Sequence, residues 1–551
     1  MSRERESTVG PENRRLLLAM VLAIAVVTVW QVLFAQKAPA PAAPGPAPQV
    51  AAPQGQPESA RPAPATEVPA PQADAPEEVV TLQGEGFRVE LSSRGGAVRH
   101  IVLESEKYKR EQGGKTIPID LVRVAEGQPL LFAVAPSAEL GGGPDPAADP
   151  AARAPMRIVE KDSRSVTFEG RAGPVGLRKT YRLTGDPYEI AVDLAVTGTD
   201  RPGAIGVVFP GFRPPDAKGG GFLSGPPLDL VRPVCRAGEK TERFNVDGDE
   251  GSTRLEGTVS WVGVDQHYFL AAAFPRPDPA GTCLFTKGPV KGSGAATLLV
   301  PVGPEGRTVS FELYAGPKDL ELLEPYGRSF GTAIDYGAVA NLFSFFARPL
   351  LWVLRFFEGI FRDWGVAIVF LTLTVKVLLY PLTAKSMQSM NQMRRLQPEI
   401  EKLKQKFGND RERLSLEQMK LFQQHKVNPL GGCLPMLIQL PIWFALYATL
   451  QTSVELYREP FLWVKDLTHH DPFFVLPLAT GVLMFVQQKI SPQPADSAQA
   501  KMMLYMMPGI FTVMMIFVPA GLTLYIFANS ALSIAQQQWM MKRMPPPPAA
   551  A

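Results

Sequence analysis

The chain has 551 residues, of which 46% are hydrophobic, and its 56 Lys and Arg nearly balance its 53 Asp and Glu, giving a formal net charge of +3. This balance argues against a protein whose whole surface binds polyanions, and the hydrophobic content excludes a wholly disordered chain. Three cysteines are too few for a disulfide-rich scaffold.

The first apolar segment covers residues 16–34 and follows a tail that carries four arginines. At about 1.5 Å per residue in a helix, this segment is long enough to cross a bilayer. A cleaved signal peptide has a shorter apolar core, of about 7–15 residues. We therefore expect residues 1–35 to be an uncleaved signal anchor with its basic tail in the cytoplasm. Residues 36–78 are rich in proline and alanine, which predicts a disordered linker.

From residue 79 to about residue 315 the hydrophobic period changes to two, in short runs separated by Gly, Pro and Asp. This pattern is typical of an antiparallel β-sandwich, which we place at residues 79–330 and call the β-domain. Residues 141–155 are expected to form an exposed loop within it. Cys235 and Cys283 also lie in this domain. An oxidising compartment would permit a disulfide between them, but the sequence leaves their pairing open.

Residues 341–362 are largely apolar, but an arginine recurs at every seventh position, at Arg348, Arg355 and Arg362. These arginines share one helical face, which predicts an amphipathic helix in the headgroup layer of a membrane. A core helix of a soluble domain is the alternative. The membrane span expected directly after this segment favours the interfacial helix.

Five further apolar segments predict membrane spans at residues 364–383, 430–451, 473–490, 504–519 and 521–540. The segment at residues 384–429 holds ten Lys and Arg against five acids, so the positive-inside rule places it in the cytoplasm. Residues 363–541 then form a five-span core, followed by a C-terminal tail at residues 542–551. With the signal anchor the chain has six spans and both termini in the cytoplasm.

The cytoplasmic segment has the apolar periodicity of two antiparallel helices. Residues 408–410 break the pattern, and a capping box predicts that the second helix begins at Ser415. We expect Leu416, Met419 and Phe422 to form the apolar stripe of this second helix. A solvated charged linker is the alternative, but a linker needs neither a stripe nor a cap.

Lys376 is the charge that enters the apolar part of the span at residues 364–383, and Thr372 lies one turn away on the same face. An unpaired lysine in hydrocarbon costs about 2.5–3.5 kcal/mol on insertion scales. The side chain could extend to the cytoplasmic interface. The other interpretation is a water-filled recess that attracts acidic segments of another polypeptide, and it is favoured because no Asp or Glu lies within any predicted span.

Enzyme signatures are missing. The five histidines form no His-Glu-x-x-His pair, and residues 114–116 only imitate the end of a phosphate-binding loop. We therefore expect no catalytic activity, no cofactor and no metal. Methionine is concentrated instead, since 15 of the 18 lie from Met387 onward. Such side chains suit a surface that accepts many apolar partners, although ordinary filling between membrane helices is the alternative.

Residues 428–447 (NPLGGCLPMLIQLPIWFALY) resemble the signature of the YidC-type membrane protein insertases. Other segments with the same resemblance lie at residues 364–381, 471–472, 487–492, 519–525 and 536–538. Residues 92–96 and 261–269 are similar to the periplasmic domain of the Gram-negative form of this family. The resemblance thus covers almost the whole chain outside the linker and the tail.

This resemblance implies a multi-domain, six-span α-helical membrane protein, with a five-helix insertase core, a signal anchor and a large periplasmic antiparallel β-supersandwich. It also implies a hydrophilic groove that opens to cytoplasm and lipid, with Lys376 in place of the usual arginine. We assign Thr372, Gln439 and Tyr525 to the groove as well. The predicted substrate slide comprises Met436, Met506 and Met507. The predicted cytoplasmic docking residues are Arg394, Arg395, Lys402 and Lys404.

The function implied by the resemblance is insertion and folding of proteins in the bacterial inner membrane, alone or with the Sec translocon. The expected partners are nascent membrane proteins, the Sec translocon and its accessory subunits, membrane lipids, and a ribosome and targeting receptor at the cytoplasmic hairpin; no nucleic-acid site is identified. The tail at residues 542–551 lacks the long basic extension that some members use at ribosomes. A solute transporter or a carbohydrate-binding membrane protein is the alternative, and the missing membrane carboxylates weigh against it.

Overall fold

The computed structural model describes residues 76–543, except for residues 113–114, 216–226, 228, 248–250, 277–280, 328–329, 335–343, 409, 426, 428–433 and 491–497. The predicted signal anchor, nearly all of the predicted linker and most of the C-terminal tail lie outside the described residues. The same is true of Cys433 and of the first part of the signature at residues 428–447.

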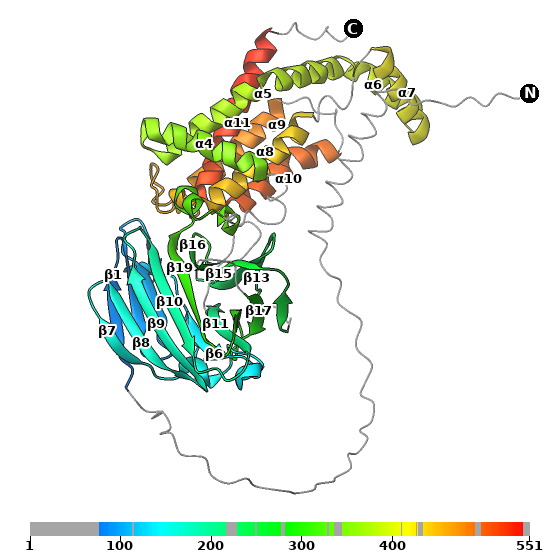
Figure 1. Cartoon of the computed structure of the whole chain (residues 1–551). Coiled ribbons are helices and arrows are strands. Elements are labelled where there is room, and N and C mark those ends of the chain that lie inside the picture. Colours follow the sequence, from blue (N-terminus) through cyan, green and yellow to red (C-terminus); the bar gives the residue numbers. More distant parts are fainter. Residues whose placement is uncertain are drawn as a thin grey trace, which may run out of the picture. The chain divides into compact units, whose positions relative to one another are not determined.

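The β-domain consists of antiparallel strands in three sheets (Figure 1). The largest sheet has nine strands, in the order β13-β12-β15-β16-β19-β10-β9-β8-β7. They are β7 (Arg157–Lys161), β8 (Ser165–Ala172), β9 (Val175–Leu183), β10 (Glu189–Thr197), β12 (Arg232–Ala237), β13 (Lys240–Arg243), β15 (Val259–Asp265), β16 (Phe269–Arg276) and β19 (Arg307–Pro317). The antiparallel, β-rich character predicted for this region is confirmed.

Two five-stranded sheets complete the domain, in the orders β1-β2-β3-β5-β4 and β14-β17-β18-β11-β6. The first comprises β1 (Val79–Gln83), β2 (Phe87–Ser92), β3 (Ala97–Leu103), β4 (Lys109–Gln112) and β5 (Lys115–Asp120). The second comprises β6 (Ala133–Pro136), β11 (Gly203–Phe212), β14 (Thr253–Leu255), β17 (Thr282–Lys287) and β18 (Ser293–Val302). Between β6 and β7, the segment predicted as an exposed loop contains the short helix η2 (Pro150–Arg153), which buries Ala152.

The period of two places alternate side chains of the central strands in one core. In β10, Ile190, Val192 and Leu194 are fully buried, while the residues between them are half-buried. Phe132 and Phe311 meet edge to face in this core, with ring centroids 5.0 Å apart. Cys235 of β12 and Cys283 of β17 form a buried disulfide, which joins the nine-stranded sheet to a five-stranded one and settles the pairing that the sequence left open.

The β-domain also buries a lysine that the sequence analysis did not single out. Lys179 lies on β9 and is fully buried, and its Nζ donates to the carbonyl oxygens of Gly95 at 2.7 Å and Phe132 at 2.8 Å. Burial lowers the pKa of Lys179 to about 7. Gly95 adopts a φ of +70°, and a Cβ there would lie 2.4 Å from the carbonyl oxygen of Ala152. Two turns of the domain are thus fixed against β9 by backbone carbonyl groups.

The C-terminal part of the chain is helical (Figure 1). Its helices are α4 (Ser344–Phe361), α5 (Trp364–Arg395), α6 (Gln397–Phe407), α7 (Arg411–Gln424), α8 (Leu434–Thr452), α9 (Val475–Ile490), α10 (Ala498–Met515) and α11 (Ala520–Arg543). The shorter helices η1 (Ala138–Leu140), α2 (Leu320–Leu323), η3 (Glu324–Tyr326), η4 (Phe330–Ala333) and η6 (Val454–Leu456) connect other elements. α11 contacts α5, α8 and α9 and lies at the centre of this helical part.

By length and composition, Trp364–Met393 of α5 is a helix that could cross a membrane, and Val475–Ile490 and Leu504–Met515 are shorter apolar helices. The number of spans stays a prediction. On α4, Trp352, Phe356 and Ile360 recur every four residues and are exposed, which leaves an apolar stripe on one face. Such a stripe is typical of a helix that lies in a membrane interface.

The segment predicted to be cytoplasmic contains two helices, α6 and α7, but two details of the prediction are wrong. α7 begins at Arg411 rather than at Ser415, because Asp410 is its N-cap and its carboxylate accepts from the backbone N–H of Arg413 at 3.0 Å. The apolar contact with α6 is made by Leu421 and Phe422, whereas Leu416 and Met419 of the predicted stripe are more than half exposed.

Candidate functional site

Polar side chains of α5, α8 and α11 meet inside an otherwise apolar group of helices. α11 contacts both of the other helices and supplies a polar partner to each. Its apolar residues, including Leu522 and Leu524, pack in one cluster with Ile368 and Leu371 of α5 and Leu446 of α8. This packing fixes α11 against both helices, so its polar residues face defined partners.

Lys376 of α5 is partly buried, and its Nζ donates a hydrogen bond to Oγ of Ser533 on α11 at 2.7 Å. Ser533 in turn donates to the backbone oxygen of Asn529 at 2.6 Å, which orients the hydroxyl so that a lone pair faces the lysine. Within the described residues, Ser533 is the polar partner of Lys376. A neutral hydroxyl holds the ammonium group in place without cancelling its charge, so the positive charge stays available to a carboxylate.

Gln439 of α8 and Tyr525 of α11 form a second pair. The Gln439 side-chain amide donates to the Tyr525 hydroxyl at 2.8 Å, and Tyr525 is almost fully buried. A half-buried amide and a buried hydroxyl pair here, so the contact links α8 to α11. The two helices must separate locally before Tyr525 can contact any other molecule.

Thr372 is buried one turn before Lys376, and its hydroxyl donates to the backbone oxygen of Ile368 at 2.7 Å. Met506 and Met507 lie on α10 with 51% and 41% of their surface exposed. They belong to an exposed apolar face of that helix, whose other large members are Tyr505, Ile510 and Val513. The side chain of Met436 lies outside the described residues.

The predicted docking residues lie around α6. Lys402 and Lys404 are exposed on this helix, while Arg395, at the end of α5, is half-buried and makes polar contacts. The side chain of Arg394 lies outside the described residues. The two lysines therefore supply a solvent-facing positive charge on the hairpin formed by α6 and α7.

The sequence analysis missed Ser533, although a signal for it was present. Ser530, Ser533 and Gln537 are spaced by three and four residues, which places them on one face of a helix. The structure confirms that this face points inward, since Ser530 and Gln537 are buried and Ser533 is half-buried. A polar stripe on an apolar helix is a signal for a buried polar contact with a neighbouring helix.

A separate cavity of about 470 Å³ lies in the β-domain. Its wall includes His100, whose Nδ1 lies 2.6 Å from Oδ2 of Asp120; this hydrogen bond raises the pKa of the histidine. Arg94 and Arg99, also in the wall, pair with Glu77. Among the described residues, no group of three or more His, Cys, Asp or Glu side chains is arranged to hold a metal ion.

Comparison with known proteins places the chain in a family. The family model described as YidC periplasmic domain matches residues 79–353, and the model described as 60Kd inner membrane protein matches residues 356–547. The membrane protein insertase YidC of Anaeromyxobacter dehalogenans (strain 2CP-C) is 60% identical over 533 residues, which cover 97% of this chain and 98% of the relative.

A more distant relative is the membrane protein insertase YidC of Geobacter metallireducens. It is 34% identical over 548 residues and covers 96% of this chain and 98% of its own length. A solved structure of an active YidC insertase with the first transmembrane domain resolved is 18% identical, with a TM-score of 0.35, and covers 84% of this chain and 94% of its own. By its two family models and its full-length relatives, the chain belongs to the YidC family of membrane protein insertases.

Proposed function

We infer that the chain is a membrane protein insertase that also assists folding of its substrates in the inner membrane. The observation that carries this inference is Lys376, a cation on an apolar helix whose described polar partner is the neutral hydroxyl of Ser533. Such a charge is costly in hydrocarbon and is retained where it acts on another charged group. It suits the acidic or polar segment of an inserting chain that must pass the membrane interior.

The driving force in this proposal is the transfer of the substrate's own apolar helix into lipid. Lys376 lowers the cost of moving the polar segment that precedes this helix, and the membrane potential assists acidic tails. The exposed face of α10 around Met506 and Met507 provides an apolar path along which the helix leaves the core. The Gln439–Tyr525 pair opens as the substrate passes between α8 and α11. No covalent bond is made or broken, so the activity is not enzymatic.

The proposed topology has six spans, with both termini in the cytoplasm and the β-domain in the periplasm. Support comes from the excess of Lys and Arg at residues 384–429. The apolar character of α5 and the disulfide Cys235–Cys283, which requires an oxidising compartment, agree with this orientation. The exposed lysines of α6 suit contact with a ribosome or a targeting receptor, and the core is proposed to act alone or beside the Sec translocon.

The test uses a strain that can be depleted of its own insertase and then supplied with variants of this chain. Insertion is followed by protease protection for two single-span substrates that differ only in an acidic or a neutral N-terminal tail. Lys376→Arg is expected to keep acidic-tail insertion, and Lys376→Leu is expected to lower it at least about tenfold, the factor for 1.4 kcal/mol of lost stabilisation. Equal insertion by both variants and the parent would refute the role of the charge.

Ser533→Ala is the matched variant at the partner of Lys376, and it keeps the positive charge. It is expected to reduce acidic-tail insertion less than Lys376→Leu does. Deletion of residues 79–315 separates this proposal from the alternative of a transporter or carbohydrate-binding protein. Retained insertion by the deletion variant supports an insertase, whereas loss of every activity favours a function that resides in the β-domain.

A further inference from the structure

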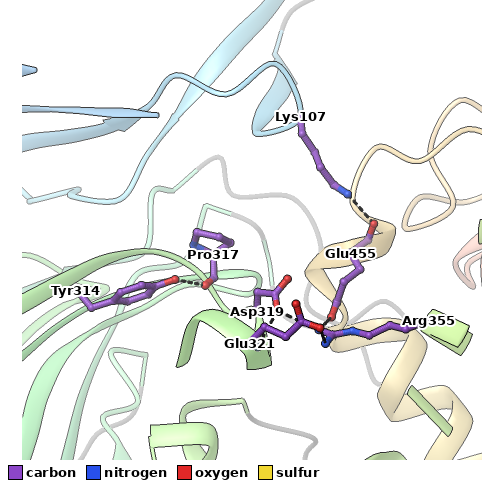
Figure 2. A network of polar contacts seen from close by, with 7 residues as sticks. All are labelled: Lys107, Tyr314, Pro317, Asp319, Glu321, Arg355 and Glu455. Atoms are coloured by element: carbon purple, nitrogen blue, oxygen red, sulfur yellow. Dashed lines mark hydrogen bonds and ion pairs between the residues drawn. The ribbon is translucent and has the colours of Figure 1, made fainter. Parts of the chain in front are cut away.

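Arg355 of α4 contacts three carboxylates at the junction between the helical part and the β-domain (Figure 2). Its Nη1 donates to Oε1 of Glu321 at 2.5 Å, and its Nη2 donates to Oδ1 of Asp319 at 2.9 Å and to Oε1 of Glu455 at 2.5 Å. Asp319 is the N-cap of α2, directly after β19, and Glu455 lies in η6, shortly after α8. One guanidinium group therefore joins three segments that are far apart in the sequence.

The charges of this junction are only partly compensated. The side chain of Arg355 is 23% exposed and that of Glu455 is 9% exposed, so both are largely removed from water. Lys107 of the β-domain adds a second cation, since its Nζ donates to the backbone oxygen of Glu455 at 2.9 Å and pairs with Glu459 at 2.7 Å. Arg355 thus contacts three carboxylates, and Lys107 pairs with a fourth. Removing Arg355 would leave Glu455 buried near other negative charges, which is more disruptive than losing an exposed charge.

Other contacts fasten the segment around Glu455 to the β-domain. The hydroxyl of Tyr457 donates to the backbone oxygen of Lys109 at 2.8 Å, and its buried ring packs edge to face on Phe269 at 5.7 Å between centroids. The ring of His267 lies 2.9 Å from the backbone oxygen of Gln451 through Nε2. Burial lowers the pKa of His267 to about 4, so the ring is neutral at physiological pH and Nε2–H is the donor.

The connectivity gives this junction a consequence for the candidate site. α4 ends at Phe361 and α5 begins at Trp364, so the position of Arg355 fixes where α5 starts. α8 ends three residues before Glu455, so the same network fixes the end of α8. α5 carries Lys376 and α8 carries Gln439. Both helices are therefore tethered to the β-domain at the ends away from the cytoplasmic hairpin.

We propose that Arg355 is a positioning residue, which holds the ends of α5 and α8 against Asp319 and Glu455 and thereby sets Lys376 and Gln439 against α11. This inference rests on the proposed insertase function for its activity readout. It assigns the segment after β19 a mechanical role at the site, separate from the rest of the β-domain. If the contacts of Arg355 with Asp319 and Glu455 served folding alone, their loss would not change how well Lys376 contacts an acidic segment of the substrate.

The test compares Arg355→Ala, Glu455→Gln, the double variant and Arg355→Lys in the full chain, reconstituted in lipid nanodiscs. Glu358→Ala is the control, because Glu358 lies on α4 three residues away and has no polar side-chain partner among the described residues. Hydrogen exchange of residues 350–361 and 453–457 is measured by mass spectrometry. Arg355→Ala is expected to raise exchange in both segments at least about tenfold, and Glu358→Ala less than about twofold.

The double variant is expected to exchange more slowly than Arg355→Ala alone, because Glu455→Gln removes the carboxylate that would otherwise be buried without a partner. Arg355→Lys keeps the positive charge but not the forked guanidinium group, so its hydrogen exchange is expected to lie between that of Arg355→Ala and that of the parent. This variant keeps the test informative if Arg355→Ala does not fold. Equal hydrogen exchange in Arg355→Ala and Glu358→Ala would overturn the proposed role of the Arg355 contacts. Additive effects of the two substitutions in the double variant would overturn it as well. This readout is independent of insertion.

The second readout is the ratio of insertion of the acidic-tail substrate to that of the neutral-tail substrate. Arg355→Ala is expected to lower this ratio at least about threefold, because a displaced α5 moves Lys376, whereas a general folding defect lowers both substrates equally. An unchanged ratio with raised exchange would overturn the positioning role. If the parent chain inserts neither substrate, the proposed function fails. The hydrogen-exchange measurements still decide whether Arg355 holds the ends of α5 and α8 in place.

Discussion

Replacing Asp265 by Asn should strongly destabilise one edge of the nine-stranded sheet. Asp265 ends β15, is fully buried and pairs with Arg232 at 3.1 Å, Arg243 at 2.7 Å and Lys318. Burial opposes its charged form, but the three cations outweigh this effect and hold the pKa of Asp265 well below its ordinary value. A depressed pKa means that the stabilisation is present above the unfolded pKa and is lost only as the pH falls through the folded one.

The magnitude follows from what Asp265→Asn leaves behind. Asn keeps an acceptor oxygen of nearly the same shape, so the variant removes the charge and leaves three cations facing one another. Breaking a buried ion pair by removing one partner costs about 3–5 kcal/mol. Arg232 is 22% exposed, so water relieves part of this cost, and we take the lower limit of about 3 kcal/mol. Local opening should then become more frequent by about two orders of magnitude.

The assay is hydrogen exchange of β12, β13 and β15 in the full chain at pH 7. Asp193→Asn is the matched control in the same sheet, since Asp193 pairs with Arg182 at 3.2 Å but both side chains are more than one third exposed. The control is expected to change exchange less than about fivefold. If Asp265→Asn and Asp193→Asn gave the same small change, the reasoning about buried charge in this domain would be refuted.

Three further outcomes are expected. Replacing Cys235 and Cys283 together by Ala should lower the free energy of unfolding of the β-domain by about 4 kcal/mol, the chain-entropy value for a sequence separation of 48. Pulse proteolysis in urea measures this change. An unchanged urea midpoint would mean that packing alone holds the two sheets together. The hydrogen bond to Asp120 raises the pKa of His100 above 6.5, so its stabilisation is complete below that pH and is lost as the pH rises through the folded pKa. The melting temperature of the parent should therefore fall more than that of His100→Gln between about pH 6 and pH 8, and parallel curves would contradict this. Asp410→Ala should raise hydrogen exchange at the start of α7 by about fivefold, which corresponds to a lost cap of about 1 kcal/mol, whereas Ser415→Ala should have almost no effect. A larger effect of Ser415→Ala would instead support the cap that the sequence predicted.

Local patterns predicted much of the fold, because each pattern reports on a few neighbouring residues. The alternation in β10 predicted a half-buried strand, and the structure buries Ile190, Val192 and Leu194 on one face. The break near residue 408 predicted two cytoplasmic helices. The cap was assigned to Ser415 because its spacing to Gln418 fits a capping box, but Asp410 lies earlier and is a sufficient cap for α7.

Contacts between distant segments could not be predicted from such patterns. Cys235 and Cys283 pair across two sheets, and nothing in their spacing reports the distance between them. Arg355 was assigned to the polar face of an amphipathic helix, but its partners Asp319 and Glu455 come from two other segments of the chain. Charge and helical period identified the residue, while its role depends on topology.

The candidate site could be predicted only in part from the sequence. Lys376 could be singled out because one charge on an apolar span is costly wherever it lies. Its partner Ser533 could have been found from the polar stripe on α11, but the pairing of α5 with α11 depends on how the helices pack. Gln439 and Tyr525 were both assigned to the groove, and the structure adds that they bond to each other.

The proposed path of an inserting chain runs between α5, α8 and α11 and leaves the core along α10. Its most direct test is photocrosslinking of a stalled nascent chain from a photoreactive residue placed in turn at positions 533, 525 and 506. Val290, an exposed apolar residue of the β-domain, is the control position. We predict crosslinks from all three helix positions, strongest from position 533 when the substrate has an acidic tail, and none from position 290. Crosslinks from position 290 with none from positions 533 and 525 would contradict the proposed path.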